Sequence, residues 1–66
     1  MRLYINGEVR EFAAGMSLLA IMQKLGIEEK VMACAVNMTI VKKEAWAEYQ
    51  PTDEDKIEML HFVGGG

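Results

Sequence analysis

The segment RLYINGEVREF, residues 2–12, decides how the fold begins. Leu3 and Ile5 alternate with polar residues, as in a strand with one buried face. The dipeptide Asn6-Gly7 follows this alternation, and Asn-Gly between two such runs is the strongest short-range signal for a β-hairpin. The chain is therefore predicted to open with two antiparallel strands joined by a tight turn.

A helix is predicted soon after this hairpin. Apolar residues recur there at helical spacing and form one face, at Leu18, Ile21, Met22 and Leu25. Ser17 can cap the first turn, and Gly26 stands where a left-handed residue ends a helix. Because pattern and both caps agree, the segment between them is predicted to be an amphipathic helix.

The rest of the chain predicts three more strands. The run VMACAV, residues 31–36, has the length and composition of a central strand buried on both faces. Residues 40–41 can form a short strand, and residues 42–49 can form one or two helical turns. A turn at residues 51–55 precedes KIEMLHFV, residues 56–63, which is predicted to be the last strand.

This order of elements places one helix on one face of a mixed sheet, which is an α+β arrangement. A first hairpin, a helix that crosses over and a last strand that returns to the middle predict a β-grasp (ubiquitin-like) fold. Its mixed sheet of four to five strands would pack on one main helix. We expect residues 1–63 to form this single domain and residues 64–66 to be a flexible glycine tail.

Composition excludes several classes of protein. The net charge is -3 and the pI is about 5.0, which argues against nucleic-acid binding and favours small molecules or a basic protein surface. The longest apolar run, residues 31–36, is far too short to cross a bilayer, and the start of the chain lacks a signal peptide. A single cysteine, Cys34, suits a reducing compartment, so we expect a cytoplasmic protein.

Few residues could support catalysis. A chain of 66 residues leaves little room for an enclosed active site beside a core. Cys34 lies between alanines in an apolar run and is predicted to be a buried filler, while His61 is predicted to be strand surface or a partner contact. One cysteine and one histidine exclude an iron-sulfur cluster or a zinc site held by this chain.

Other distinctive side chains are expected to serve structure. Met22, Met32 and Met59 are predicted to fill gaps in the core, because methionine adapts to irregular spaces. Trp46 is predicted to close the core. The acidic segment at residues 52–55 lacks the spacing of a calcium loop and is predicted to be a solvated turn.

The end of the chain, HFVGGG, is the most distinctive feature. Gly64, Gly65 and Gly66 reach roughly 10 Å beyond Val63 when extended, which is enough to enter a narrow tunnel in another protein. A carboxylate is a poor electrophile, so an external enzyme would have to activate it, most simply as an anhydride. A disordered terminus without function is an equally weighted alternative.

The last strand has two alternating faces. Ile57 and Met59 can point towards the helix while Leu60 and Phe62 occupy the other face, although the alternation alone leaves open which set is inward. If Leu60 and Phe62 are outward, they form with Val63 an exposed patch beside the tail. Such patches are typical of binding surfaces, so these three residues are predicted to dock a partner.

Together these features resemble the ThiS family of bacterial sulfur carriers of thiazole biosynthesis, relatives of the molybdopterin synthase small subunit and of ubiquitin. The resemblance covers nearly the whole chain. It rests on INGE (5–8), SLLAIMQKLG (17–26), AVNMTIVKKEAW (35–46), DED with KIEMLHF (53–62) and VGGG (63–66).

The resemblance implies a carrier cycle and not an enzyme. An E1-like, ThiF-type adenylyltransferase using ATP and magnesium would adenylate the Gly66 carboxylate, and a sulfur donor system would convert it to a thiocarboxylate. Gly64, Gly65 and Gly66 would enter that enzyme and then a ThiG-type thiazole synthase, which receives the sulfur. This chain would bind no cofactor. The alternatives are a carrier for molybdopterin, cysteine or homocysteine synthesis, or a β-grasp interaction module that carries nothing.

Overall fold

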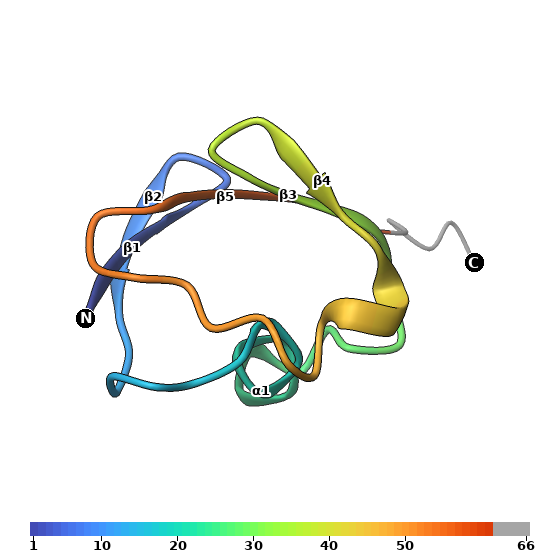
Figure 1. The fold of residues 1–66 in the computed structure, drawn as a ribbon, viewed down its shortest axis with the longest axis horizontal. Helices are drawn as coiled ribbons and strands as arrows, with labels where there is room; N and C mark the ends of the chain where they lie inside the picture. Colours follow the sequence, from blue (N-terminus) through green and yellow to red (C-terminus); the bar gives the residue numbers. More distant parts are fainter. Residues whose placement is uncertain (62–66) are drawn as a thin grey trace.

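A five-stranded sheet lies over a single α-helix in the computed structural model, which describes residues 1–61 (Figure 1). The predicted boundary between domain and tail therefore lies outside the described residues. The elements, in chain order, are β1 (Arg2–Ile5), β2 (Glu8–Glu11), α1 (Leu18–Leu25), β3 (Val31–Val36), β4 (Thr39–Val41), the 3-10 turn η1 (Lys43–Ala45) and β5 (Lys56–His61).

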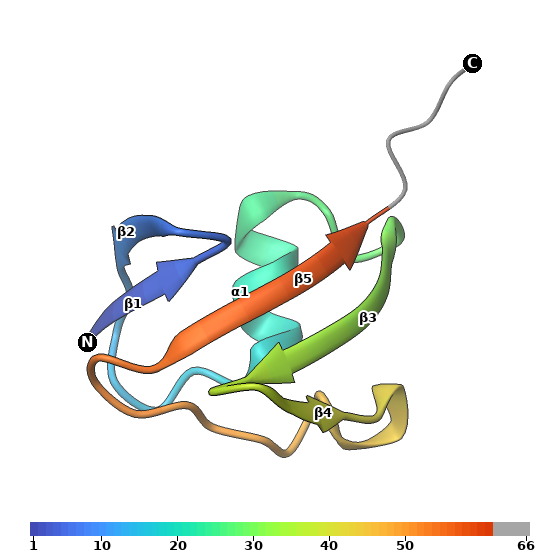
Figure 2. The same ribbon diagram turned by 90° about the horizontal axis from the view of Figure 1, so that it is seen from above.

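The strands are ordered β2-β1-β5-β3-β4, so the last strand of the chain occupies the middle of the sheet. β1 and β5 run parallel, and the other neighbours are antiparallel. Figure 2 shows β1 and β5 side by side with α1 behind them. This arrangement confirms the predicted mixed sheet and β-grasp fold.

The first hairpin forms as its sequence predicts. Asn6 and Gly7 both adopt positive φ, 50° and 86°, which a two-residue hairpin turn requires. β2 ends at Glu11, and Phe12 turns into the core with 7% of its surface exposed. All four residues of β2 are exposed, so this edge strand covers no core.

Both predicted caps of α1 are present. The Ser17 hydroxyl accepts a hydrogen bond from the Ala20 N–H at 3.1 Å, and Gly26 ends the helix in the left-handed region at φ 73°. The apolar face that the spacing predicts is buried against the sheet, through Leu18, Ile21 and Met22. Local sequence therefore accounts for both the extent and the orientation of this helix.

The segment around η1 covers the N-terminal end of α1. The Leu18 N–H donates to the Tyr49 carbonyl at 2.9 Å, and the Leu19 N–H donates to the Trp46 carbonyl at 3.0 Å. Trp46 is 2% exposed, which confirms that it closes the core. Backbone donors that a helix leaves free at its start are thus satisfied by a segment more than 25 residues away.

The prediction that residues 31–36 are buried on both faces is wrong. Val31, Cys34 and Val36 face α1 and are buried, but Met32 is 63% exposed and so does not fill the core. β3 is also flanked by the edge strand β4, so the central strand is β5. The physical reason is that one helix covers only one face of this sheet, and an apolar run does not reveal how many layers enclose it.

The core lies between the sheet and α1. Met22 and Met59 belong to it, as predicted, and within the described part of the chain it contains no buried polar or charged residue. Among residues 1–61, no helix has the length and apolar character needed to cross a bilayer. The buried residues are Leu3, Ile5, Phe12, Leu18, Ile21, Met22, Val31, Cys34, Val36, Val41, Trp46, Ile57 and Met59.

Candidate functional site

The predicted site residues fall at and beyond the end of β5. Of these, Leu60 lies within the described part of the chain, whereas Phe62, Val63 and the glycines at 64–66 lie outside it. β5 also settles which face is inward: Ile57 and Met59 are buried at 1% and 4% exposure, and Leu60 is 64% exposed. The structure thus answers the question that the alternation left open, and Leu60 is an outward apolar residue.

β5 is held from both sides. It pairs with β3 along its length, from Ile57 opposite Val36 to His61 opposite Val31. On the other side it pairs with β1, but this pairing covers only the first two residues of β5. β5 is therefore the central strand of the sheet, and its last residues pair with β3 alone.

Asn6 extends the contact between β1 and β5 beyond the last residue of β1. Its side-chain Nδ2 donates to the Met59 carbonyl at 3.0 Å, and its Oδ1 accepts from the Met59 N–H at 2.7 Å. One amide group thus makes the two hydrogen bonds that a neighbouring strand would make. The sequence indicated Asn6 only as a turn residue, because nothing local signals a partner 53 positions away.

The acidic segment before β5 has a structural role. The Asp53 carboxylate accepts from the Arg2 N–H at 2.6 Å, and the Asp55 carboxylate accepts from the Thr52 N–H at 2.9 Å. A backbone hydrogen bond adds to these contacts, because the Glu54 N–H donates to the Arg2 carbonyl. Over residues 1–61, no group of three or more potential metal-ligating side chains occurs. The hydrogen bonds of this segment agree with the predicted turn and tie the start of β5 to β1.

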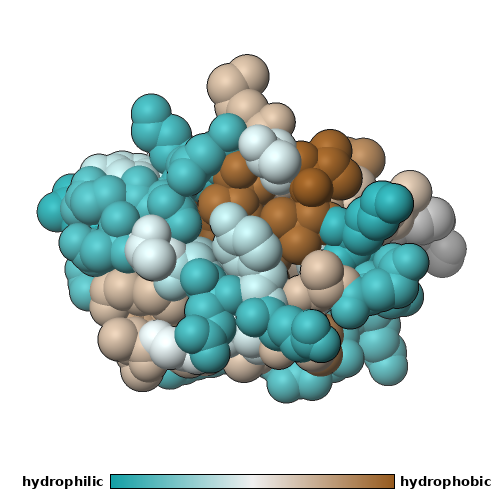
Figure 3. All heavy atoms as spheres, in the orientation of Figure 1, coloured by the Kyte–Doolittle hydropathy of each residue, from teal (hydrophilic) through white to brown (hydrophobic). Residues whose placement is uncertain are grey.

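An apolar band covers part of the sheet face that points away from α1. Leu60 on β5 is paired with Ala33, and Ala35 is paired with Ile40 of β4, so these four residues share one face. Ile40 is 67% exposed, and the two alanines are half-buried. Figure 3 shows hydrophobic atoms gathered on this upper surface. We call Leu60, Ala33, Ala35 and Ile40 the outer band.

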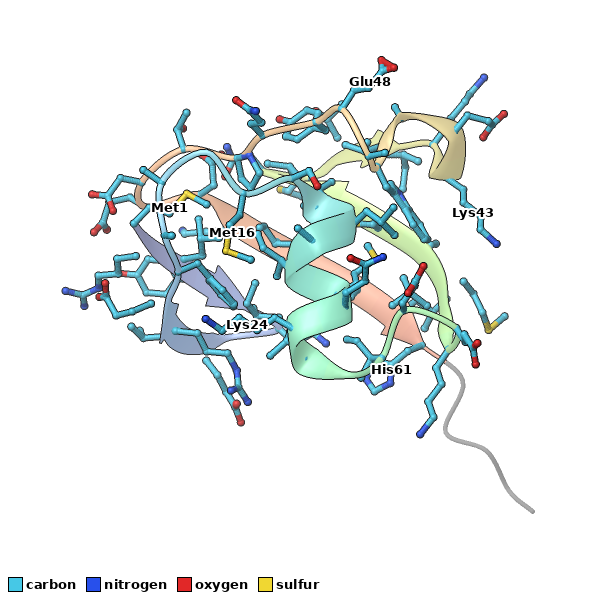
Figure 4. All side chains as sticks on the ribbon, turned by 90° about the horizontal axis from the view of Figure 1, so that it is seen from below. Met1, Met16, Lys24, Lys43, Glu48 and His61 are labelled. Carbon is cyan, nitrogen blue, oxygen red and sulfur yellow. The ribbon has the colours of Figure 1, made fainter. Side chains whose placement is uncertain are left out.

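His61 lies on the opposite face of β5. It is half-buried at the end of the strand, on the side of the sheet that faces α1 (Figure 4). A depression of about 300 Å³ lies there, lined in part by His61, Arg10 and Glu8. No serine, threonine or cysteine lines it, so His61 has no nucleophile to activate in that depression.

Cys34 is buried, as predicted. It is 1% exposed, and burial raises the pKa of its thiol from 9.0 to about 11. Because the thiolate is the reactive form, the protein's one cysteine is chemically inert near neutral pH.

We expect the burial of Cys34 to make stability fall as the pH rises from about 9 towards about 11. In that range the unfolded chain loses the thiol proton while the folded chain keeps it, so deprotonation favours unfolding, by up to about 3 kcal/mol. Urea unfolding across this pH range measures the effect. In Cys34→Ala the decline should be shallower by this amount. Identical pH profiles for the two proteins would contradict the assignment.

The comparisons with known proteins agree with this geometry. The ThiS family model matches residues 3–66. The chain belongs to the ThiS family. The predicted resemblance is thereby confirmed, including its extent over nearly the whole chain.

Curated relatives of this ThiS-family chain fall into two groups. It is 29% identical to the sulfur carrier protein ThiS of Escherichia coli, over the full length of both chains. It is also 41% identical to part of a thiazole synthase of Paramagnetospirillum magneticum, where the match covers all of this chain and 20% of that protein. The chain thus spans about a fifth of the thiazole synthases that it matches.

A solved structure shows the same fold. The thiamine biosynthesis protein ThiS of Geobacter metallireducens superposes with a TM-score of 0.81 at 27% identity, and the match covers all of both chains. The sheet order and the single covering helix are therefore those of a ThiS-family β-grasp domain.

Proposed function

We propose that this ThiS-family protein is a sulfur carrier of thiamine biosynthesis, and that the carboxylate of Gly66 holds the sulfur. The observation that carries the proposal is the family match, which extends through the glycines to residue 66 and includes a named sulfur carrier matched over its full length. The names of the Paramagnetospirillum magneticum and Geobacter metallireducens relatives refer to thiazole and thiamine synthesis. They favour this pathway over molybdopterin, cysteine or homocysteine synthesis.

The described part of the chain supports a carrier better than an enzyme. Three depressions in it have volumes of about 340, 250 and 300 Å³, and none of these three is lined by a serine, threonine or cysteine. What the fold does provide is a central strand, held by β3 and by Asn6, that ends three positions before the first glycine in the sequence. A rigid platform with a short arm suits a group that other proteins modify.

The chemistry then belongs to the partners. A carboxylate oxygen of Gly66 attacks the α-phosphorus of ATP, the acyl adenylate forms and pyrophosphate leaves. Hydrosulfide from the donor system attacks the carbonyl carbon, AMP leaves and a thiocarboxylate remains. Adenylation is needed because a carboxylate has no leaving group, and the resulting sulfur is a nucleophile that can be delivered to the acceptor.

Two partner proteins follow from this scheme. A ThiF-type adenylyltransferase binds the tail first, with ATP and magnesium in its own site. A ThiG-type thiazole synthase binds it second, and the relatives in which a matching segment is part of a thiazole synthase support this partner. Gly64 and Gly65 would let the tail enter both sites, because glycine offers no side chain to obstruct a narrow passage.

Both partners need a surface to bind, and we propose that the outer band with Phe62 and Val63 supplies it. Leu60 and Ile40 are each more than 60% exposed in a domain whose other apolar side chains mostly face α1. Apolar surface of this kind is the usual centre of a protein interface.

Mass spectrometry tests the function directly. Incubation with the adenylyltransferase, ATP, magnesium and sulfide is expected to give a species heavier by the difference between one sulfur and one oxygen atom. Fragmentation should place this increment at residue 66. A parallel reaction without ATP is the control, because sulfide alone cannot displace a carboxylate oxygen. If the adenylyltransferase is active on another carrier and no such species forms here, the proposal is wrong.

A further inference from the structure

The turn between β3 and β4 contains an unusual residue, Met38. Asn37 and Met38 occupy the two central positions of the turn with φ of 49° and 72°. Asparagine tolerates the left-handed region, but methionine does so only at a cost in free energy, because its Cβ crowds the backbone. Glycine would fill this position without strain.

Packing does not compensate for this strain. The Met38 residue is 93% exposed, the highest value among the large apolar residues in the described part of the chain. It therefore contributes little to the core and presents a long apolar side chain to solvent. Neither the local conformation nor the stability of the fold accounts for methionine here.

The turn is nevertheless held firmly in place. The Asn37 N–H donates to the Lys56 carbonyl at 2.7 Å, and the Asn37 Oδ1 accepts from the Lys56 N–H at 3.0 Å. The Asn37 Nδ2 also donates to the Asp55 carboxylate at 3.0 Å. These three bonds fix the turn to the start of β5, so the backbone of Met38 has a defined position before any partner binds.

This position is next to the outer band. Figure 1 shows the turn between β3 and β4 standing on the side of the sheet away from α1. A depression of about 340 Å³ lies beside it, lined by Met38 and by Tyr4, Lys56 and Glu58 of the outward sheet face. Along β5, the four residue-to-residue steps from Ile57 to His61 span about 13 Å. A protein that covers the outer band and receives the tail therefore also reaches Met38.

We propose that Met38 is an anchor residue for the thiazole synthase, inserting its thioether side chain into an apolar pocket of that protein. The inference rests on the proposed function. Thiazole synthase is the occupant because matching segments occur within thiazole synthase chains, so that this surface and the synthase are parts of one protein there. An unbranched, polarizable side chain adapts well to such a pocket, and a pre-positioned anchor loses little entropy on binding.

Replacing Met38 by glycine should raise the stability of the fold and weaken binding. Met38→Gly removes the strain, so we expect a thermal midpoint about 5 °C higher. It also removes the anchor, so we expect the Kd for purified thiazole synthase, measured by calorimetry, to rise about tenfold. Met38→Gln is the matched control, because it keeps the length and backbone strain but replaces the apolar tip. It should leave the midpoint near that of the wild type and weaken synthase binding to a similar extent.

The results separate this proposal from the proposed function. Wild-type protein that forms no thiocarboxylate would overturn the carrier function. Wild-type protein that forms it, with both Met38 variants binding the synthase as tightly as wild type, would overturn only the anchor. An equal loss of affinity for the adenylyltransferase and for the synthase would overturn the assignment of Met38 to the synthase. A higher midpoint with unchanged binding would show that the exposed methionine contacts nothing.

Discussion

Replacing Trp46 by alanine is expected to leave the protein largely unfolded at room temperature. The indole is 2% exposed, and its Nε1–H donates to the Val41 carbonyl at 2.9 Å. Removing a buried tryptophan costs about 3–5 kcal/mol through lost burial and the cavity that remains. A single core in a domain of this size supplies about 3–5 kcal/mol in total, so the loss is comparable to the whole stability.

The effect of Trp46→Ala on stability extends beyond the loss of the indole contacts. The Trp46 carbonyl accepts from the Leu19 N–H, and Tyr49 accepts from Leu18, so this segment also completes the first turn of α1. Losing the indole anchor loosens the segment and returns those helix donors to water. Far-ultraviolet circular dichroism during urea titration is the suitable measurement, because the variant lacks the tryptophan that fluorescence would follow.

Trp46→Phe separates the two contributions of the side chain. Phenylalanine keeps most of the apolar surface but leaves the buried Val41 carbonyl without its donor, which costs about 1–3 kcal/mol. We therefore expect this variant to fold with intermediate stability. If Trp46→Ala remained within about 1 kcal/mol of the wild type, the core would be closed by other residues and the role given to Trp46 would be wrong.

Much of this fold is predictable because its signals are local. The hairpin turn at Asn6-Gly7 and the helix between Ser17 and Gly26 depend on residues that are neighbours in sequence, and both occur where expected. The burial of β3 was misjudged for a different reason. A run of apolar residues indicates a strand in the sheet interior, but whether a second layer covers that strand depends on the whole chain. The exposure of Met32 shows that no layer covers the outer face of β3 at this residue.

The candidate site also combines features that local sequence predicts with features that depend on contacts between distant segments. The glycines and the two alternating faces of the last strand can be read from the sequence, but only the structure shows that Leu60 is on the outward face. Ile40 joins Leu60 only because β3 lies between β4 and β5, which is a property of the sheet order. Asn6 was missed as a support of β5 because its partner, Met59, is distant in sequence. Contacts between distant segments have no signature in a single sequence, and the site depends on several of them.

The role of the outer band in partner binding can be tested without disturbing the core. Among the variants that test binding, Leu60→Lys is expected to have the largest effect. Leu60 points away from α1 and is 64% exposed, so a lysine there should change the free energy of unfolding by less than about 1 kcal/mol. In a complex, however, the charge would be placed in an apolar interface without a partner. A central interface residue altered in this way costs about 2 kcal/mol or more, which raises the Kd at least about thirtyfold.

Val9→Lys is the matched control for this variant. Val9 is also an exposed apolar residue on a strand, at 49%, but it lies on the edge strand β2, on the far side of β1 from β5. If the outer band is the docking surface, the Kd for the adenylyltransferase and the synthase should change much more in Leu60→Lys than in Val9→Lys, while both variants keep wild-type unfolding midpoints. Equal changes would indicate a general effect of added positive charge, and no change in either would mean that affinity comes from the tail alone.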